Sequence, residues 1–455
     1  MASTIQDMTN GKEVPLLLRF TIPLLIGNLF QQCYSIVDSM IVGHVEGANA
    51  LGAIGCTNWI TYILFACVNG LGIGAGIMVA QFFGALERER IKQAIANSFY
   101  IIIILGVFLS VLGIFISRPV LALLGTPTSQ IEDAVDYMQI ICGGTFAIAL
   151  YNYVAHVMRA LGDSKTPLLF LLLASFLNIA LDVVFVVQLG RGVKGAAYAT
   201  VLSQLVAALF SVVYAIWKNP YFRLGIKDLR LSKELIFLCF KVGLPLAAQS
   251  MMISLSCVIL QSMVNRFDGA VVSAFTVTSK VELLLDQPFI ALSSALSTFT
   301  GQNMGAKKQD RVMRAFRWSV IITTIYCLLV VGMIFLFDEQ IARIFVEEVY
   351  VVQISSTALR IMGVMYWPLG MIFIIRGILN GAGDTGYALT NGIVEVACRI
   401  GFSLIFVFLI PIGMWAVWIA TGLTWCVTAL TAFIRYRRGI WKKDTMQKKH
   451  MVLRG

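Results

Sequence analysis

"TIPLLIGNLFQQCYSIVDSMIVG", residues 21–43, lies in an apolar run from Pro15 to Ile41 that sets the fold class of this chain. Only two charged side chains, Arg19 and Asp38, interrupt the run. A helix of about 20 residues crosses the hydrocarbon core of a bilayer, so a run of this length predicts a transmembrane helix. Asp38 near its end is costly to bury, and it therefore needs a partner or a functional role.

The rest of the chain repeats this pattern. Of its 455 residues, 58% are hydrophobic and 13% are charged, and the mean hydropathy is +0.84, which leaves too little polar surface for a water-soluble globule. The apolar runs do not alternate as transmembrane strands would, so we expect an all-α polytopic membrane protein with twelve transmembrane helices. The predicted spans cover residues 15–41, 50–80, 93–117, 133–158, 167–189, 194–217, 235–262, 270–299, 313–337, 350–379, 386–410 and 412–434.

The net charge of +11 indicates orientation rather than nucleic-acid binding. If both termini are cytoplasmic, most of the 35 lysines and arginines fall in the inner segments. This positive-inside asymmetry predicts a multi-pass protein with both termini in the cytoplasm and no nucleic-acid partner. The basic segment "RYRRGIWKKDTMQKKH", residues 435–450, is expected to touch anionic lipid headgroups of the bilayer.

The second half of the chain is a copy of the first. A nearly constant offset aligns "TIPLL" with "GLPLA", "AQFFGALERERI" with "GQNMGAKKQDRV", "MRALGDSKTPL" with "LNGAGDTGYAL", and Ala199-Thr200 with Ala420-Thr421. The first pair superimposes Pro23 on Pro245 and predicts a bend in both helices. Each half contains six spans, an even number, so the copies are parallel repeats related by a pseudo-two-fold axis along the membrane normal.

This repeat predicts two lobes facing a central cleft, an architecture typical of alternating access. We expect an N-terminal six-helix lobe at 1–217, a cytoplasmic inter-lobe loop at 218–234, a C-terminal six-helix lobe at 235–438 and a basic cytoplasmic tail at 439–455.

"NGLGIGAG", residues 69–76, is rich in glycine but is not a nucleotide-binding loop. It lacks the G-x-G-x-x-G spacing and follows no predicted strand. Small residues inside a membrane helix instead predict close packing against a neighbouring helix.

The predicted spans of the second half contain charges of both signs. Mutual neutralisation and a role in substrate or proton handling are both open interpretations. Glu395 and Arg399 are four residues apart and can pair directly, whereas Glu282 and Asp286 share a face and repel. The candidate network comprises Lys280, Glu282, Asp286, Arg360, Glu395 and Arg399.

Apart from Arg19 near the inner end, the charges buried in the predicted spans of the first half are acidic only. Counting along the helices places Asp38, Asn178, Asp182 and Thr200 at similar depth in the outer half of the membrane. This set of oxygen ligands suits a hard cation such as sodium. Alternatively, two close acids cannot easily both ionise, and one of them holds a proton. A third interpretation is that the two acids lie singly at a wet boundary.

These residues resemble those of the multidrug and toxic compound extrusion (MATE) transporters, in the bacterial branch that includes DinF-like and MepA-like proteins. The resemblance rests on "TIPLLIGNLFQQCYSIVDSMIVG", "LSTFTGQNMGA", "ALGDSKTP", "NGAGDT" and the Asn178-x-x-x-Asp182 pair. It implies an antiporter in the cell membrane of a bacterium that exports amphipathic, often cationic compounds in exchange for protons or sodium. In DinF-like relatives the coupling site corresponds to Asp38, Asn178, Asp182 and Thr200. NorM-like relatives use a glutamate in span 7, which is absent here.

A lipid-linked precursor flippase of the same superfamily is the alternative. Its anionic substrate would need basic residues lining both lobes, whereas the first lobe has none within its spans beyond Arg19 near the inner end. We expect no enzymatic activity, since the three histidines form no HExxH and no GxSxG or Walker A motif occurs. No cofactor is expected, and the protein is expected to be a monomer. Aromatic residues such as Tyr34 and Tyr137 are typical of helix packing, so they are not placed in the site.

Overall fold

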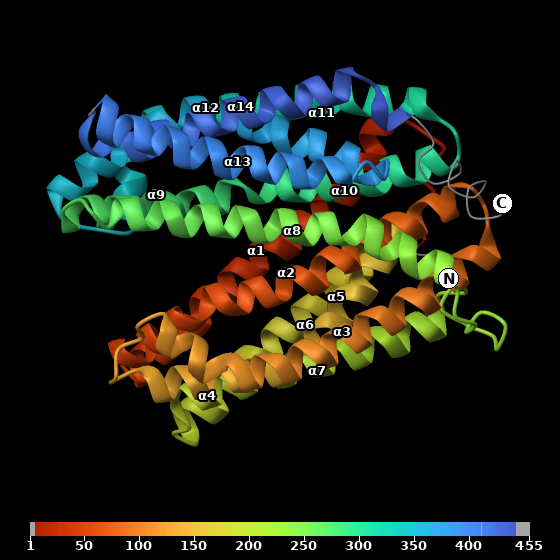
Figure 1. The fold of residues 1–455 in the computed structure, drawn as a ribbon, viewed down its shortest axis with the longest axis horizontal. Helices are drawn as coiled ribbons and strands as arrows, with labels where there is room; N and C mark the ends of the chain where they lie inside the picture. Colours follow the sequence, from red (N-terminus) through yellow and green to blue (C-terminus); the bar gives the residue numbers. More distant parts are fainter. Residues whose placement is uncertain (1–4, 411, 443–455) are drawn as a thin grey trace. The chain divides into compact units, whose positions relative to one another are not determined.

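The computed structural model describes residues 5–410 and 412–442, which form long helices joined by short loops (Figure 1). No strand occurs in this part of the chain. The predicted all-α fold class is therefore confirmed. The predicted basic tail lies outside the described residues from residue 443 onward.

The helices follow the predicted spans closely. The first six spans correspond to α1 (Glu13–Val45), α2 (Ala48–Gly84), α3 (Arg88–Leu123), α4 (Ile131–Gly143) with α5 (Thr145–Ala160), α6 (Lys165–Asp182) with the π-helical turn η1 (Val183–Gln188), and α7 (Gly192–Lys218). The last six correspond to α8 (Lys233–Val264), α9 (Gly269–Leu285) with α10 (Gln287–Gly305), α11 (Gln309–Arg343), α12 (Val349–Gly381), α13 (Gly386–Leu404) with the π-helical turn η2 (Ile405–Leu409), and the turn η3 (Gly413–Trp415) with α14 (Ala416–Arg437). A last short turn, η4, covers Ile440–Lys442.

Most of these helices have the length and the apolar composition of membrane-spanning helices. Within residues 5–410 and 412–442, nine helices are long and apolar enough to cross a bilayer, and α4 with α5, bent by 46°, adds a tenth. The two remaining spans are α9 with α10 and α13 with η2, and charged residues interrupt both. Together these elements give the twelve-helix fold that the sequence predicts.

The chain divides into two compact units, each holding one copy of the six-span repeat. Unit 1 comprises residues 1–10, 22–247 and 305–307, and unit 2 comprises residues 11–21, 248–304 and 308–455. Both α1 and α8 contribute to the two units, and the change from one unit to the other falls beside Pro23 and Pro245.

The duplication is visible in the helix bounds. Helices α2, α3, α6 and α7 begin at positions 48, 88, 165 and 192, and their counterparts α9, α11, α13 and η3 begin at positions 269, 309, 386 and 413, so the separation is the same for all four pairs. The turns η1 and η2 also recur, at 183 and 405. The copies differ where α9 and α10 are separated at Asp286, whereas α2 is continuous.

Each unit has its own packing. In unit 1, α2 packs against α3, α4 and α5, and α7 packs against α4, α5 and α6. In unit 2, α12 packs against α9, α11 and α14, and α13 packs against α14. The buried Trp418 donates its indole N–H to Thr278 Oγ1 at 3.0 Å, so the polar atom of this large core side chain is satisfied.

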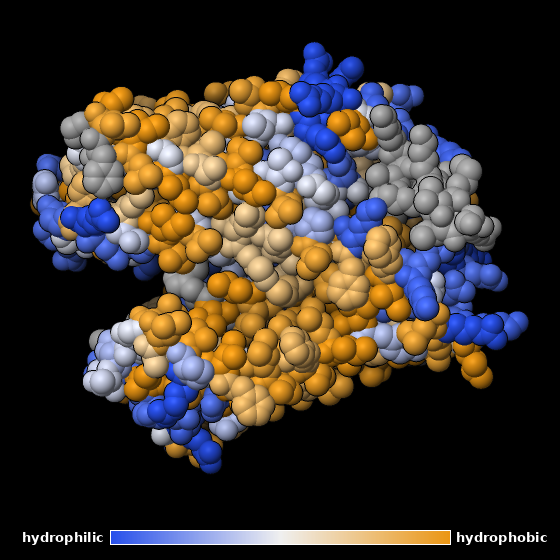
Figure 2. Space-filling model, in the orientation of Figure 1, coloured by the Kyte–Doolittle hydropathy of each residue, from blue (hydrophilic) through white to orange (hydrophobic). Residues whose placement is uncertain are grey.

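The helix sides are apolar and exposed. Figure 2 shows hydrophobic residues over most of the visible helix surface, with hydrophilic residues gathered near the helix ends. The side chains of Phe115 and Leu336, for example, are 76% and 71% exposed. A surface of this kind is unfavourable in water but contacts lipid tails when the helices span a bilayer.

The glycines of the stretch 69–76 bring α2 against the first part of α8. A Cβ atom at Gly74 would lie 2.7 Å from the backbone of Gly243, and one at Gly70 would lie 2.5 Å from the backbone of Ala247. These separations leave no space for a side chain. The prediction of close helix packing by small residues is therefore confirmed.

We expect Gly74→Ala to lower the melting temperature of the detergent-solubilised protein, because the new methyl group forces α2 and α8 apart at a cost of about 1–3 kcal/mol. Gly55→Ala is the matched control, because it lies on the same helix and its Cβ would meet no atom within 4 Å. It should leave the melting temperature unchanged or raise it slightly. Equal losses for the two variants would contradict the packing argument.

Candidate functional site

The four predicted first-half residues lie on three helices of unit 1. Asp38 is near the C-terminal end of α1, Asp182 is the last residue of α6, with Asn178 one turn earlier, and Thr200 is in the first half of α7. Asp182 and Asn178 are buried, and Asp38 and Thr200 are partly buried.

These helices bring the polar groups together. The carboxyl groups of Asp38 and Asp182 lie close enough to interact electrostatically. The Asn178 side-chain amide donates to Thr200 Oγ1 at 3.5 Å. Among the described residues, no N–H or O–H group reaches either carboxyl oxygen of Asp182, Oδ1 of Asp38 or Oδ1 of Asn178. Four buried oxygens therefore lack a donor, and a shared proton or a bound cation would satisfy them.

Apolar residues close one end of this cluster. Val42, Val186 and Ala196 lie one helical turn beyond Asp38, Asp182 and Thr200, in the direction of the α1 C-terminus. They pack together with Ala50 and Ile54 of α2 and with Val193 in one buried group. This group keeps water from the acids on that side, which increases the free-energy cost of leaving them charged.

A π-helical turn follows Asp182 directly. Turns of this kind are often found at functional sites. Here, however, η2 occurs at the equivalent position of the second copy, where no acid precedes it. The turn is therefore part of the duplicated scaffold. At Gly195, a Cβ would lie 3.0 Å from the backbone of Phe185, so this glycine lets α7 approach the turn closely.

Two tyrosines that were not placed in the site lie close to it. Tyr34 and Tyr137 are both within electrostatic range of Asp38 and Asp182. Tyr34 is four residues before Asp38 on α1, a spacing that the sequence could have revealed. Tyr137 comes from α4, and nothing in the sequence relates it to α1 or α6.

The charges of unit 2 form a compact network around Glu395. Arg376 of α12 pairs with Glu395 Oε2 at 2.6 Å, and Arg399 pairs with Glu395 Oε1 at 3.3 Å. Arg376 also donates to Asn391 Oδ1 at 2.6 Å. The sequence predicted the pair of Glu395 and Arg399 but not the contact of Glu395 with Arg376.

The other predicted members of this network are dispersed. Glu282 is within electrostatic range of Arg399 and Glu395 and makes no salt bridge among the described residues. Asp286 lies at the junction of α9 and α10, and its buried Oδ1 has no donor among them. Lys280 is exposed. Arg360 pairs with Asp338 of α11, so the structure does not bring it to Glu395.

No group of three or more His, Cys, Asp and Glu side chains in the described residues could hold a metal ion. A sodium ion at the first-half cluster would therefore depend on amide and hydroxyl oxygens as well as the two carboxylates. Asn178 and Thr200 supply such oxygens, and oxygen-only ligand sets suit hard cations. The residues present thus fit either a proton or sodium.

The family model MatE matches residues 23–184 and again residues 245–405. The chain belongs to the MatE family. The two matches begin at Pro23 and Pro245, the prolines that the repeat superimposes. The predicted resemblance to MATE transporters is thereby confirmed.

Relatives of this MatE protein match it over nearly its whole length. The probable multidrug resistance protein YpnP of Bacillus subtilis is 31% identical over 438 residues, covering 96% of this chain and 97% of the relative. A structure of an outward-facing multidrug resistance MATE family transporter aligns with a TM-score of 0.91 and 27% identity, covering 97% of this chain and 99% of the other. A MOP superfamily transporter from Pyrococcus furiosus, whose reversed pocket polarity suggests a different function, aligns with a TM-score of 0.91 and 26% identity, covering 97% and 99%.

We expect Glu395→Gln to destabilise this MatE protein strongly, because it removes the carboxylate that pairs with both Arg376 and the buried Arg399. Removing one partner of a buried ion pair costs about 3–5 kcal/mol. The measurement is the melting temperature in detergent. Glu132→Gln is the control, because it removes one charge from the exposed pair of Arg118 and Glu132. That change should cost less than about 1 kcal/mol. A larger loss for Glu132→Gln would refute the structural role of the network.

Proposed function

We propose that this protein is a secondary active antiporter that exports amphipathic, often cationic compounds in exchange for protons or sodium. The observation that carries the proposal is the pair of neighbouring carboxyl groups, Asp38 and Asp182, without hydrogen-bond donors on their buried oxygens. Two anions cannot be stable there together, so the site favours a bound proton or cation. Asn178 and Thr200 complete the proposed coupling site.

Coupling follows from the helices that carry these groups. With a cation bound, Asp38 of α1 and Asp182 of α6 attract a shared positive charge, and without it they repel. A bound cation therefore stabilises one arrangement of α1 against α6, and this arrangement becomes less stable when the cation is released. A substrate that binds better to the cation-free arrangement would exchange with the cation across the membrane.

Alternating access of two lobes is the proposed means of exchange. The parallel repeat favours it, since two similar six-helix units are the usual basis of such transport. The prolines of α1 and α8, located where each helix passes from one compact unit to the other, favour bending there. A solved relative is described as outward-facing, which is one of the two states that the mechanism needs.

The charges of unit 2 have separate proposed roles. Arg376, Glu395 and Arg399 neutralise one another and stabilise the helix packing of α12 and α13. Glu282 and Asp286 are left as acids that could attract a cationic substrate or handle a proton. Together with the acids of unit 1, they favour cationic over anionic cargo.

A lipid-linked precursor flippase is less favoured, because the predicted spans of the first half offer no base for an anionic substrate beyond Arg19 near one end. One solved relative with this fold is described as having a binding pocket of reverse polarity that suggests a different function. We propose a bacterial cell membrane as the location, with both termini cytoplasmic, and a monomer as the active form.

The test is transport of ethidium, an amphipathic cation, by the purified protein in vesicles with either a proton or a sodium gradient. The gradient that drives transport identifies the coupling ion. We expect Asp38→Asn and Asp182→Asn to reduce gradient-driven transport at least about tenfold, the effect of removing about 1.4 kcal/mol of coupling free energy. An asparagine has no charge for the cation to neutralise.

The control is Asp136→Asn, which removes an acid of the same unit from its exposed pair with Lys194. Its transport rate should stay within about twofold of the native rate, since exposed pairs contribute little. If both site variants insert in native amounts and transport at the native rate, the coupling role of Asp38 and Asp182 is wrong.

A further inference from the structure

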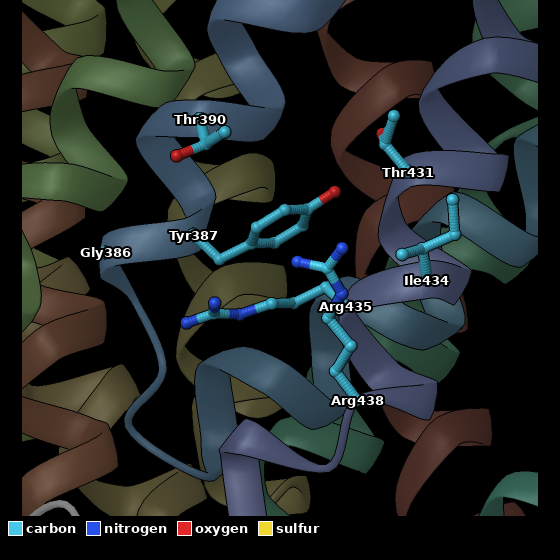
Figure 3. A pocket seen from close by; sticks show the side chains of 7 residues that line it. All are labelled: Gly386, Tyr387, Thr390, Thr431, Ile434, Arg435 and Arg438. Carbon is cyan, nitrogen blue, oxygen red and sulfur yellow. The ribbon is translucent and has the colours of Figure 1, made fainter.

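A cavity of about 300 Å³ opens between the N-terminus of α13 and the C-terminus of α14, within unit 2. It is distant in sequence from the coupling residues and plays no part in the proposed exchange. Figure 3 shows the Tyr387 ring extending from α13 toward two guanidinium groups from α14 and its end. Residues with polar or charged groups in its lining are Tyr387, Thr390, Thr431, Arg435 and Arg438, and Gly386 adds backbone.

The charge in this cavity is positive. Arg435 donates two hydrogen bonds to Asp384, at 2.9 and 2.7 Å, so its charge is balanced. Its guanidinium also lies 5.7 Å from the centre of the Tyr387 ring, which fixes its position. Arg438 is exposed and pairs with no acid in the part of the chain that the structure describes. One positive charge is therefore available to a ligand.

Backbone groups add to this positive character. Gly386, the first residue of α13, lines the cavity, and the N-cap residue Thr385 makes no capping bond with its side chain. The N–H groups of Tyr387 and Ala388 donate to the carbonyl oxygens of Asp384 and Thr385 at 3.3 and 2.9 Å, so the start of α13 contributes mainly the positive end of its helix dipole, which attracts anions. The hydroxyl groups of Thr390 and Thr431 lie on the two sides of the cavity. The Thr431 hydroxyl already donates to the carbonyl oxygen of Thr428 at 2.9 Å, so the Arg438 guanidinium and the Thr390 hydroxyl are the side-chain donors that suit the oxygens of a phosphate group.

An exposed apolar strip continues from the cavity along the same two helices. On α13, Leu389 and Ile393 are 36% and 49% exposed, and on α14, Leu430 and Ile434 are 58% and 43% exposed. Leu389 and Ile393 follow Gly386 by three and seven residues, which places them on its face of the helix. Ile434 lines the cavity itself, and Leu430 is one turn away from it. The site thus joins an anion-binding end to a surface for hydrocarbon chains.

From this arrangement we infer that the cavity binds the phosphate of an anionic phospholipid, whose acyl chains lie along α13 and α14. A soluble phosphate compound would contact the polar end of the site but not the apolar strip. The apolar strip therefore favours a lipid as the ligand. The inference concerns the surrounding bilayer and holds whatever compound the protein exports.

The test is lipid binding to the full-length protein by native mass spectrometry, with phosphatidylglycerol as the probe. We expect Arg438→Gln to weaken binding of the first phosphatidylglycerol about fivefold, since one interfacial arginine contributes about that factor. Arg438→Lys keeps the charge but loses the planar donor pair, so its affinity should be intermediate. Phosphatidylethanolamine, which has no net charge, should bind the native protein at least about fivefold more weakly than phosphatidylglycerol.

Arg437→Gln is the matched control, because it removes the same charge one residue earlier, from a side chain that lies over Phe433 and does not line the cavity. It should bind phosphatidylglycerol like the native protein, and all variants should have the native melting temperature without lipid. Equal affinity of Arg438→Gln and the native protein would overturn the inference. So would an equal loss in Arg437→Gln, or displacement of the lipid by millimolar inorganic phosphate, which would indicate a site for free anions.

Discussion

The interaction on which the account depends is the one between the carboxyl groups of Asp38 and Asp182. They lie close together in unit 1, and no donor of the described residues reaches either oxygen of Asp182. In a low-dielectric interior this arrangement is stable only with a positive charge between the acids. Because the two acids are on different helices, the energy of that charge would depend on how α1 and α6 pack, and the proposed coupling of cation binding to conformation rests on this dependence.

The second copy of the repeat shows how the same backbone serves another purpose. The helix bounds repeat at a constant offset, and the π-helical turn after α6 recurs after α13. At that offset, Arg399 and Ser403 occupy the positions of Asn178 and Asp182. Arg399 pairs with Glu395, one turn away on α13, and Arg376 of α12 pairs with the same carboxylate. The duplicated scaffold thus holds an unneutralised pair of acids in one unit and a charge-balanced network in the other.

Much of this could be predicted from the sequence. The length of an apolar run, the offset of the repeat and the depth of a residue along a helix all follow from positions in the sequence. They located twelve spans and the helices of the four site residues. Contacts between helices do not follow from positions in the sequence, because they depend on how the helices pack. The proximity of Tyr137 to the acids depends on the packing of α4, and the pairing of Arg376 with Glu395 joins two helices. The partner of Arg360 is Asp338, the residue that directly follows the predicted span 313–337.

The most direct test of the central claim is the affinity of the purified protein for ethidium, measured at equilibrium across a range of sodium concentrations and of pH. If substrate and cation bind to alternative states, raising the coupling cation weakens ethidium binding to the native protein. In Asp182→Asn, the account predicts that this dependence disappears while binding persists. If the variant retains the native dependence on both sodium and pH, Asp182 does not link the two ligands and the account is wrong.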